Sequence, residues 1–327
     1  MQQRKLGASG PEVGALALGC MSFAGFYGAT GKADSFATLK RALDLGITHL
    51  DTALLYGMGL SEEIIGEFCA ANPNEFVIAS KCGIVPKPER HFNNRRDYIR
   101  EAVEGSLKRL RADHIPLYYL HRRDHEVPIE DAMGFMAELV REGKIGGIGL
   151  SEIAPSTLER AHAVHPVMAV QNEYSLWTRQ PELGLIQACK RLGTAFIAFS
   201  PVGRGIFADH APDPASFAHT DFRKTNPRFM GGNWLRNNAR IDRFRAYAQN
   251  RGWNTSALAT AWTLAQGDHI IPIPGTRTAT HLDELAQSLT IRLGAPELAE
   301  IEEMLPVGFA HGNRYTDAQT LGTETYC

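Results

Sequence analysis

The chain has 327 residues, a length typical of one α/β barrel, and 44% of them are hydrophobic, which is enough for a large core. Its formal net charge of -2 gives no electrostatic reason to expect binding to nucleic acid or to an anionic membrane surface. No apolar run of about 18 residues is present, and the first residues lack the apolar core of a signal peptide. Five cysteines without a CxxC pair favour a reducing compartment, so we expect a cytoplasmic protein.

In chain order, a segment with glycine and proline at 5–13 predicts a small hairpin, and a buried strand follows at 15–19. A glycine-rich loop, 25–31, precedes a helix over 34–45 whose apolar residues recur at helical spacing. Short apolar runs then predict strands at 47–53, 76–81, 115–121, 144–151, 166–174, 194–200 and 269–275. Amphipathic runs predict helices at 61–68, 97–110, 130–141, 155–163, 181–192, 237–250, 256–265, 280–288 and 295–305.

The alternation of short apolar strands with helices is typical of a parallel sheet with crossover helices. About eight such units favour a closed barrel over an open sheet. We therefore predict a single (β/α)8 TIM barrel with an N-terminal β-hairpin and two extra helices. A long irregular stretch, 201–234, interrupts the rhythm, but no shift in composition marks a second domain, so residues 1–327 are predicted to form one.

Chemically useful residues stand at the ends of three consecutive predicted strands. Asp51, Lys81 and His121 occupy these ends, and Tyr56 follows Asp51 on a loop. In a parallel barrel these ends meet at one mouth. Such a group can protonate a carbonyl oxygen: Tyr56 would be the acid, Lys81 would lower its pKa, and Asp51 would hold the ammonium. His121 would orient the substrate oxygen.

Each of these residues also has an ordinary explanation when taken alone. Asp51 could cap a turn, Tyr56 could be a loop aromatic, and Lys81 could be a solvated loop end. His121 could be a satisfied strand-end histidine or could form a metal-binding pair with His125. Their arrangement at consecutive strand ends favours the catalytic interpretation over these alternatives.

The chain resembles an aldo-keto reductase along nearly its whole length, through several motifs in the family's order. The motifs are LDTALLYG at 50–57, ASK at 79–81, YLHRRD at 119–124, GIGLS at 147–151, VQNEYS at 170–175, FSPVGRG at 199–205 and IPGTR at 273–277. The resemblance implies a TIM barrel that binds NADPH without a Rossmann domain, and no GxGxxG motif opens a helix here. It also implies a catalytic tetrad of Tyr56, Lys81, Asp51 and His121.

The resemblance also implies which residues bind NADPH. They are Ser151 and Gln171 at the carboxamide, Phe199 against the nicotinamide ring, Ser200, Pro201, Val202, Gly203 and Gly205 around the pyrophosphate, Gly275, Thr276 and Arg277 at the 2′-phosphate, Glu284 at the adenine end, and Gly19, Met21 and Asp51. A guanidinium matches a phosphate well, so Arg277 favours NADPH over NADH. The family often has asparagine after this serine, whereas this chain has Glu152, whose contact with the carboxamide is left open.

Two kinds of substrate are compatible with the loops expected around the site, and Tyr56, His121 and Arg122 are predicted to contact it. These loops are 21–27, Leu54 and Leu55, 86–94, Arg122 and Arg123, and Trp234. Apolar residues such as Phe23 and Phe26 would suit an aromatic or medium-chain carbonyl compound. Arg122 and Arg123 could instead select an anionic group.

We therefore predict an NADPH-dependent reductase of aldehydes or ketones, with a small-molecule carbonyl substrate, no metal, no nucleic acid and no membrane partner, as a monomer or homo-oligomer. The basic run at 223–228 is expected to lie in a loop that closes over the cofactor. An alternative is a redox-sensing module, because potassium-channel beta subunits resemble this family and bind NADPH while acting on a partner. Another is a metal-dependent hydrolase that uses His121 and His125.

Overall fold

The computed structural model describes residues 2–326; Met1 and Cys327, the ends of the predicted single domain, lie outside the described residues. Eight parallel strands form one sheet in which neighbours in space follow one another along the chain. They are β3 (Leu18–Gly19), β4 (His49–Asp51), β5 (Val77–Cys82), β8 (Leu117–Leu120), β9 (Ile148–Ser151), β10 (Val167–Glu173), β11 (Ala195–Phe199) and β12 (Ile270–Ile273). A parallel bridge between Gly19 and Gly275 joins the first strand to the segment after the last. The predicted barrel is confirmed.

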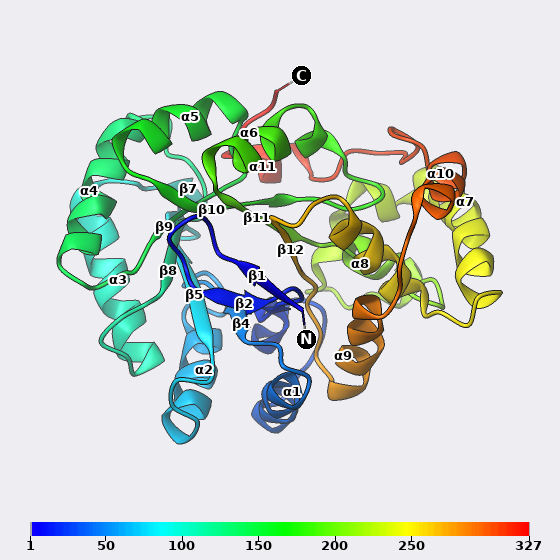
Figure 1. Cartoon of the computed structure of the whole chain (residues 1–327), viewed down its shortest axis with the longest axis horizontal. Coiled ribbons are helices and arrows are strands. Elements are labelled where there is room, and N and C mark those ends of the chain that lie inside the picture. Colours follow the sequence, from blue (N-terminus) through cyan, green and yellow to red (C-terminus); the bar gives the residue numbers. More distant parts are fainter. Residues whose placement is uncertain (1, 327) are drawn as a thin grey trace.

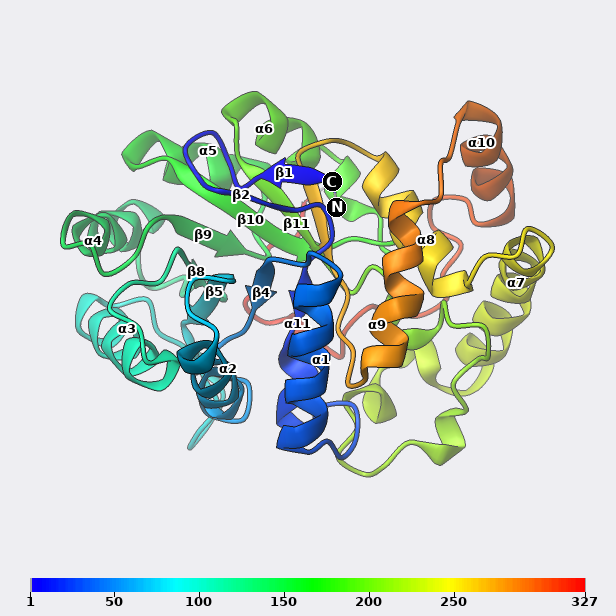
Figure 2. The same ribbon diagram turned by 60° about the horizontal axis from the view of Figure 1, so that its bottom comes forward.

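Helices follow the barrel strands and surround the sheet (Figure 1). They are α1 (Lys32–Asp44), α2 (Leu60–Ala71), α3 (Arg96–Leu110), α4 (Ile129–Arg141), α5 (Pro155–Val164), α6 (Leu185–Leu192), α8 (Thr255–Ala265) and α9 (Ala279–Ala286). Figure 2 shows α1 and α9 side by side, so the helix after the first strand packs against the helix after the last. The ring of helices therefore closes in the same way as the sheet.

Further elements are added to the barrel. The predicted N-terminal hairpin is present as the antiparallel pair β1 (Gln3–Lys5) and β2 (Glu12–Gly14). The helices α7 (Gly231–Gln249) and α10 (Ala295–Met304) pack together at one side of the barrel (Figure 1). A small pair, β6 (Ile84–Val85) and β7 (His91–Phe92), and the short helix α11 (Asp317–Thr320) were not predicted. The 3-10 turns are η1 (Met21–Ala24), η2 (Gln180–Glu182), η3 (Gly203–Gly205), η4 (Pro214–Ser216), η5 (Phe222–Thr225), η6 (Pro227–Phe229) and η7 (Gln287–Leu289).

The helix α7 begins at Gly231, earlier than the predicted start at residue 237. Glycine disfavours helix, so its local sequence argues against this start. Tertiary contacts outweigh that preference: the ring of Trp234 stacks on Phe229 at 5.6 Å between centroids, and Asn237 Nδ2 donates to the Arg228 carbonyl at 3.1 Å. The end of the predicted irregular stretch is therefore helical.

The core has two parts because strand side chains alternate between the sheet's two faces. In β11, Phe196 and Ala198 belong to the apolar layer between the sheet and the helices, whereas Ile197 belongs to the cluster inside the barrel. Leu6 and Val13 of the hairpin join the interior cluster. The hairpin therefore fills one end of the barrel and leaves the carboxyl ends of the strands for the site.

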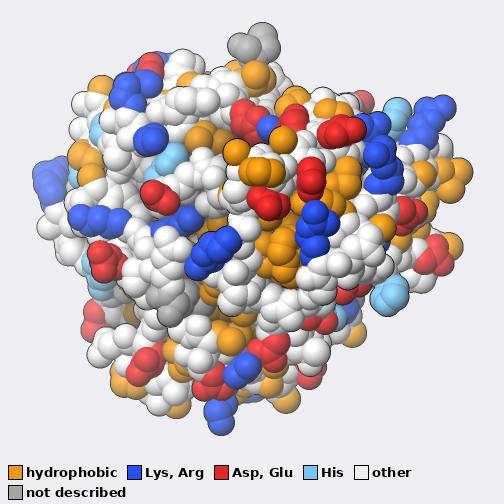
Figure 3. All heavy atoms as spheres, turned by 45° about the vertical axis from the view of Figure 1, so that its right-hand side comes forward, with side chains coloured by type: hydrophobic (Ala, Val, Ile, Leu, Met, Phe, Trp, Pro, Cys, Tyr) orange, Lys and Arg blue, Asp and Glu red, His pale blue; other side chains and the backbone are white. Residues whose placement is uncertain are grey.

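On the face over α8, α9 and α10, acidic and basic side chains are interspersed, with apolar groups between them (Figure 3). This distribution agrees with the small net charge of the sequence. Within residues 2–326, no helix is both long and apolar enough to cross a bilayer.

Candidate active site

The four residues predicted to form the catalytic group come together at the carboxyl ends of neighbouring strands. Asp51 ends β4, Lys81 lies near the end of β5, His121 directly follows β8, and Tyr56 lies in the turn after β4. All four side chains are buried, and each residue is at most 8% exposed. Because β4 pairs in parallel with β5, and β5 with β8, the ends of these strands bring the four side chains together.

A buried ion pair joins Asp51 to Lys81. Lys81 Nζ donates to Asp51 Oδ1 and also to the Thr52 carbonyl at 2.7 Å. The other carboxylate oxygen, Oδ2, accepts from Gln171 Nε2 at 2.7 Å. Burial lowers the pKa of Lys81, and the charge of Asp51 opposes this shift. Because both carboxylate oxygens have a donor, Asp51 fixes the position of the ammonium group.

Tyr56 lies between this ion pair and His121. Lys81 Nζ is 5.1 Å from the centre of the Tyr56 ring, and the ring of His121 stands edge-on at 5.9 Å. Burial raises the pKa of Tyr56 well above its ordinary value of 10, and the charge of Asp51 adds to the rise. Burial therefore outweighs any lowering of the pKa by Lys81 in the protein without cofactor, and that role of Lys81 stays a prediction. The phenol stays protonated at neutral pH and can donate its proton.

His121 is held as a neutral imidazole. Its backbone N–H donates to the Cys82 carbonyl at 2.7 Å, which fixes the start of the loop after β8. Burial, followed by the charges of Arg122, Lys81 and Arg90, lowers the pKa of His121 well below 6.5. A neutral imidazole can donate a hydrogen bond to a carbonyl oxygen without adding a charge to the site.

The metal-site alternative finds no support in the arrangement of side chains. His125 lies in an exposed turn. Among residues 2–326, no group of three or more histidine, cysteine, aspartate or glutamate side chains is placed to hold a metal ion.

Buried histidines should make the stability of the protein depend on pH. Burial lowers the pKa of His49 and of His121 from 6.5, so both stay neutral in the folded chain while the unfolded chain takes up protons. We expect the free energy of unfolding to be highest above about pH 6.5 and to fall below it, by up to about 1.4 kcal/mol per histidine for each pH unit. Urea denaturation between pH 7 and pH 5 measures this, and a midpoint that does not move would contradict it. His49→Gln should remove part of the slope.

A cavity of about 580 Å³ opens beside the predicted catalytic group. Most of the residues predicted to bind cofactor or substrate line it, namely Gly19, Met21, Asp51, Tyr56, His121, Arg122, Ser151, Gln171, Phe199, Ser200, Val202, Gly205, Gly275, Thr276, Arg277 and Glu284. Pro201 and Gly203 do not line it and are buried. The structure thus brings residues from widely separated motifs to one cavity.

Far along the chain from the catalytic group, Arg277 has the properties of a phosphate ligand. Its Nη1 donates to the Ala29 carbonyl at 3.3 Å, and no carboxylate within residues 2–326 pairs with it. A Cβ atom on Gly28 would lie 2.7 Å from this nitrogen and would displace it, and the φ of 111° at this position favours glycine. Gly205, with φ of 92°, likewise brings bare backbone to the cavity wall. These features fit a phosphate-bearing dinucleotide.

Glu152, whose contact with the carboxamide the sequence left open, does not line this cavity. Its carboxylate pairs with Arg314 and accepts from the Glu173 backbone N–H at 2.9 Å. Glu173 in turn accepts from Arg204 at 2.9 Å, and Arg204 also donates to the Arg314 carbonyl at 2.6 Å. Glu152 therefore helps to fasten the C-terminal segment to the barrel mouth.

The walls of the cavity differ in part from those expected. Phe23 lies in the core, Trp234 stacks on Phe229, and Arg123 pairs with Glu324 at 2.8 Å, so these three do not line it. Leu54 is absent from its lining as well. Residues that line it and that the sequence analysis missed include Arg204, Phe222, Tyr315 and Gln319. In the basic run, Arg223 lines the cavity, whereas Arg228 donates to Thr178 at 2.7 Å; that this loop closes over the cofactor stays a prediction.

Comparison with known proteins agrees with this geometry. The family model described as "Aldo/keto reductase family" matches residues 15–306. The chain is an aldo-keto reductase. It is 39% identical to "Probable aldo-keto reductase 1" of Glycine max over 324 residues, which covers 96% of this chain and 92% of that protein.

Solved structures of other aldo-keto reductases share the fold. A glycerol dehydrogenase from Gluconobacter oxydans superposes with a TM-score of 0.85 at 27% identity, over 93% of this chain and 94% of that one. An aldo-keto reductase from Bacillus halodurans in its holo form gives 0.77 at 25% identity, over 98% and 99% of the two chains. Family membership implies carbonyl reduction that depends on a nicotinamide cofactor.

Proposed function

We propose that this aldo-keto reductase reduces an aldehyde or ketone with NADPH and that Tyr56 is the general acid. One observation carries the proposal: a buried group of Asp51, Tyr56, Lys81 and His121 borders a cavity whose lining also contains the unpaired Arg277. The buried group of four residues suits proton donation to a carbonyl oxygen, and the guanidinium of Arg277 suits binding of a phosphate.

In this proposal each residue has a defined task. When bound, the reduced nicotinamide supplies the hydride that forms the new C–H bond. Tyr56 gives its hydroxyl proton to the carbonyl oxygen as that oxygen gains the electron pair of the C=O bond. His121 donates a hydrogen bond that orients the same oxygen, and the Asp51–Lys81 pair keeps a positive charge near the phenolate that remains. Ser151 and Gln171 would hold the carboxamide, with Phe199 against the ring.

The choice of NADPH over NADH rests on Arg277. Arg277→Ala should weaken NADPH binding by about 10- to 100-fold, because a charge-assisted hydrogen bond to the 2′-phosphate is lost. NADH, which lacks that phosphate, should bind with nearly unchanged affinity. Fluorescence titration with each cofactor gives both dissociation constants.

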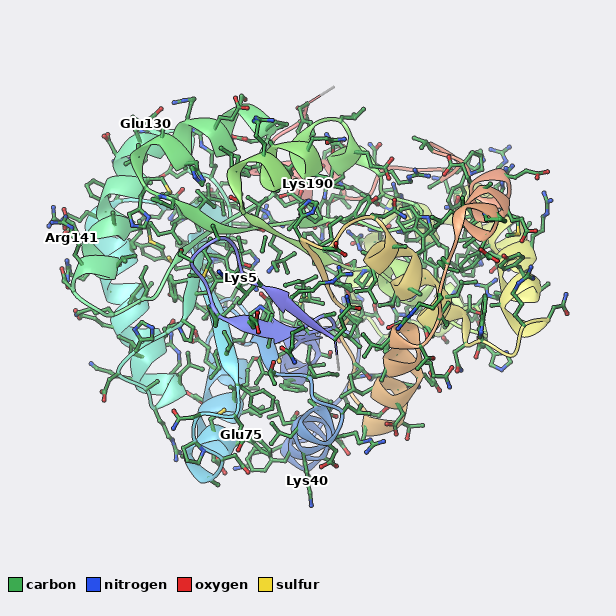
Figure 4. All side chains as sticks on the ribbon, in the orientation of Figure 1. Lys5, Lys40, Glu75, Glu130, Arg141 and Lys190 are labelled. Carbon is green, nitrogen blue, oxygen red and sulfur yellow. The ribbon has the colours of Figure 1, made fainter. Side chains whose placement is uncertain are left out.

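A surface variant controls for the change in net charge. Lys40 extends from α1 into solvent (Figure 4), so Lys40→Ala alters the charge by the same amount without touching the cavity. It should bind both cofactors like the wild type. Equal losses for NADPH and NADH in Arg277→Ala would show that Arg277 does not meet the 2′-phosphate.

Steady turnover separates this proposal from a redox-sensing module. Absorbance of NADPH should decay through many equivalents when an activated aromatic aldehyde is added. A chain that binds NADPH but does not turn over would contradict the proposal and favour the sensor.

The single domain over residues 1–327 and the cytoplasmic location remain predictions.

A further inference from the structure

The catalytic end of the cavity has an excess of positive charge. Among residues 2–326, Asp51 is the only acidic residue that lines this end, and Lys81 neutralises it. Two arginines, Arg90 and Arg122, line the cavity beside His121, and neither pairs with a carboxylate within residues 2–326. The other cationic lining residues are accounted for: Arg204 pairs with Glu173, Arg223 pairs with Asp221, and Arg277 is assigned to the cofactor phosphate.

Arg122 is the more constrained of the two. It is 8% exposed, and its Nη1 donates to the His121 carbonyl at 2.6 Å and to Ser151 Oγ at 3.1 Å. These contacts fix the guanidinium beside His121, but neither of them is to a carboxylate; the nearest charge that acts on it is that of Glu152, which pairs with Arg314. Leaving a buried cation without a counter-ion is unfavourable, and a bound anion relieves that cost.

Arg90 reaches the same place from the loop between β6 and β7. Its Nη1 donates to the Ala318 carbonyl at 2.9 Å, so the C-terminal segment positions it. Arg90 is exposed, and partial burial, followed by the charge of Arg122, lowers its pKa, so the two like charges disfavour each other. An anionic group between them would replace this repulsion with two attractions.

The neighbouring walls are apolar. Phe26, Leu55, Ile84 and Tyr315 line the cavity, and the Phe26 ring stands edge-on to Tyr56 at 6.0 Å. A ligand here therefore meets a hydrophobic surface as well as two cations. The sequence left open whether the substrate is apolar or anionic. The two arginines and the apolar walls together suit one molecule that has both an anionic group and an apolar part.

We propose that the substrate is an aldehyde or ketone that also carries a carboxylate, which Arg122 and Arg90 bind while the carbonyl oxygen meets Tyr56 and His121. The inference rests on the carbonyl reduction proposed above. A planar guanidinium donates two parallel hydrogen bonds to a carboxylate, which orients as well as attracts it. The apolar walls would contact the hydrocarbon part between the two groups.

A matched pair of substrates tests this. 4-Formylbenzoate and its methyl ester have similar size and a similarly activated aldehyde, but only the first is charged. With NADPH, the wild type should show kcat/KM at least about tenfold higher for the acid than for the ester, as expected for a charge-assisted hydrogen bond. Arg122→Met and Arg90→Met should each lower kcat/KM for the acid and abolish most of this preference. The value for the ester should change less than about threefold in Arg90→Met.

The control is Arg95→Met, which removes the same charge from an exposed residue that pairs with Glu126 outside the cavity. It should keep the wild-type preference. Equal or better turnover of the ester by the wild type overturns the inference while leaving the carbonyl reductase intact. Equal losses for both aldehydes in Arg90→Met and Arg122→Met also overturn it and assign these residues to a step common to all substrates. No NADPH consumption with either aldehyde contradicts the proposed function itself.

Discussion

Replacing Tyr56 with phenylalanine is expected to lower kcat by about 100-fold or more, because the hydroxyl that donates the proton is lost. The ring remains, so its edge-on contacts with His121 and Phe26 and its packing near Lys81 are retained. The dissociation constant of NADPH should therefore stay within about twofold of the wild type. NADPH absorbance decay measures the rate, and fluorescence titration measures binding.

Tyr27 offers a matched control for this substitution. It is a half-buried tyrosine that lines the same cavity, and its ring lies 5.4 Å from the Arg223 guanidinium. Tyr27→Phe removes a hydroxyl from the cavity wall without touching the proposed acid, so kcat should change far less. If Tyr56→Phe kept the full rate, another group would have to supply the proton.

Removing the Asp51 carboxylate is expected to destabilise the fold strongly. Asp51→Ala leaves the Lys81 ammonium buried without a counter-ion, since Lys81 is fully buried and its remaining acceptor is the Thr52 carbonyl. Breaking a buried ion pair in this way costs about 3–5 kcal/mol of the free energy of unfolding. Urea denaturation at pH 7 measures the loss.

A double-mutant cycle shows whether the pair is responsible. Lys81→Met combined with Asp51→Ala removes both charges, so the double variant should be more stable than the sum of the single losses predicts. The loss in Asp51→Ala alone should shrink from pH 7 to pH 9, because an unpaired buried lysine has a lowered pKa and is neutral when folded. Additive losses would mean that the two residues do not act as a pair.

An exposed ion pair provides the reference for this cycle. Lys144 and Glu104 also form a lysine–carboxylate pair, at 2.6 Å, but their side chains are 29% and 46% exposed. Water solvates either partner when the other is removed, so Glu104→Ala should have a much smaller effect on stability than Asp51→Ala. A similar loss in both variants would contradict the role assigned to burial.

Several features of the fold and site were predictable because their causes are local. Apolar runs of strand length alternate with amphipathic helices along the chain. This alternation predicts a parallel sheet with crossover helices, and about eight units favour a closed barrel. Because the carboxyl ends of parallel strands share one edge, the positions of Asp51, Lys81 and His121 at strand ends were enough to predict that they meet. Their meeting is observed, and their catalytic roles remain predictions.

Other features depend on contacts between residues that are distant in the sequence. Glu152 was a candidate cofactor contact, but it pairs with Arg314 and does not line the cavity. Tyr315 lies in a tail with no periodic pattern, so nothing local placed it in the cavity wall. The start of α7 at Gly231 was missed because packing of Trp234 on Phe229 outweighs the low helix propensity of glycine.

The sequence by itself determined the barrel, the family and the residues that gather at its mouth, since periodicity and strand-end position are properties of short segments. The tertiary structure alone decided the electrostatics of the site. The pKa of Tyr56 is raised where a neighbouring lysine suggested that it would be lowered, because burial acts more strongly than that charge. Likewise, Arg122 forms no ion pair within residues 2–326, while Arg123, the next residue, pairs with Glu324. Burial and pairing depend on which surfaces the folded chain removes from water, and no short segment contains that information.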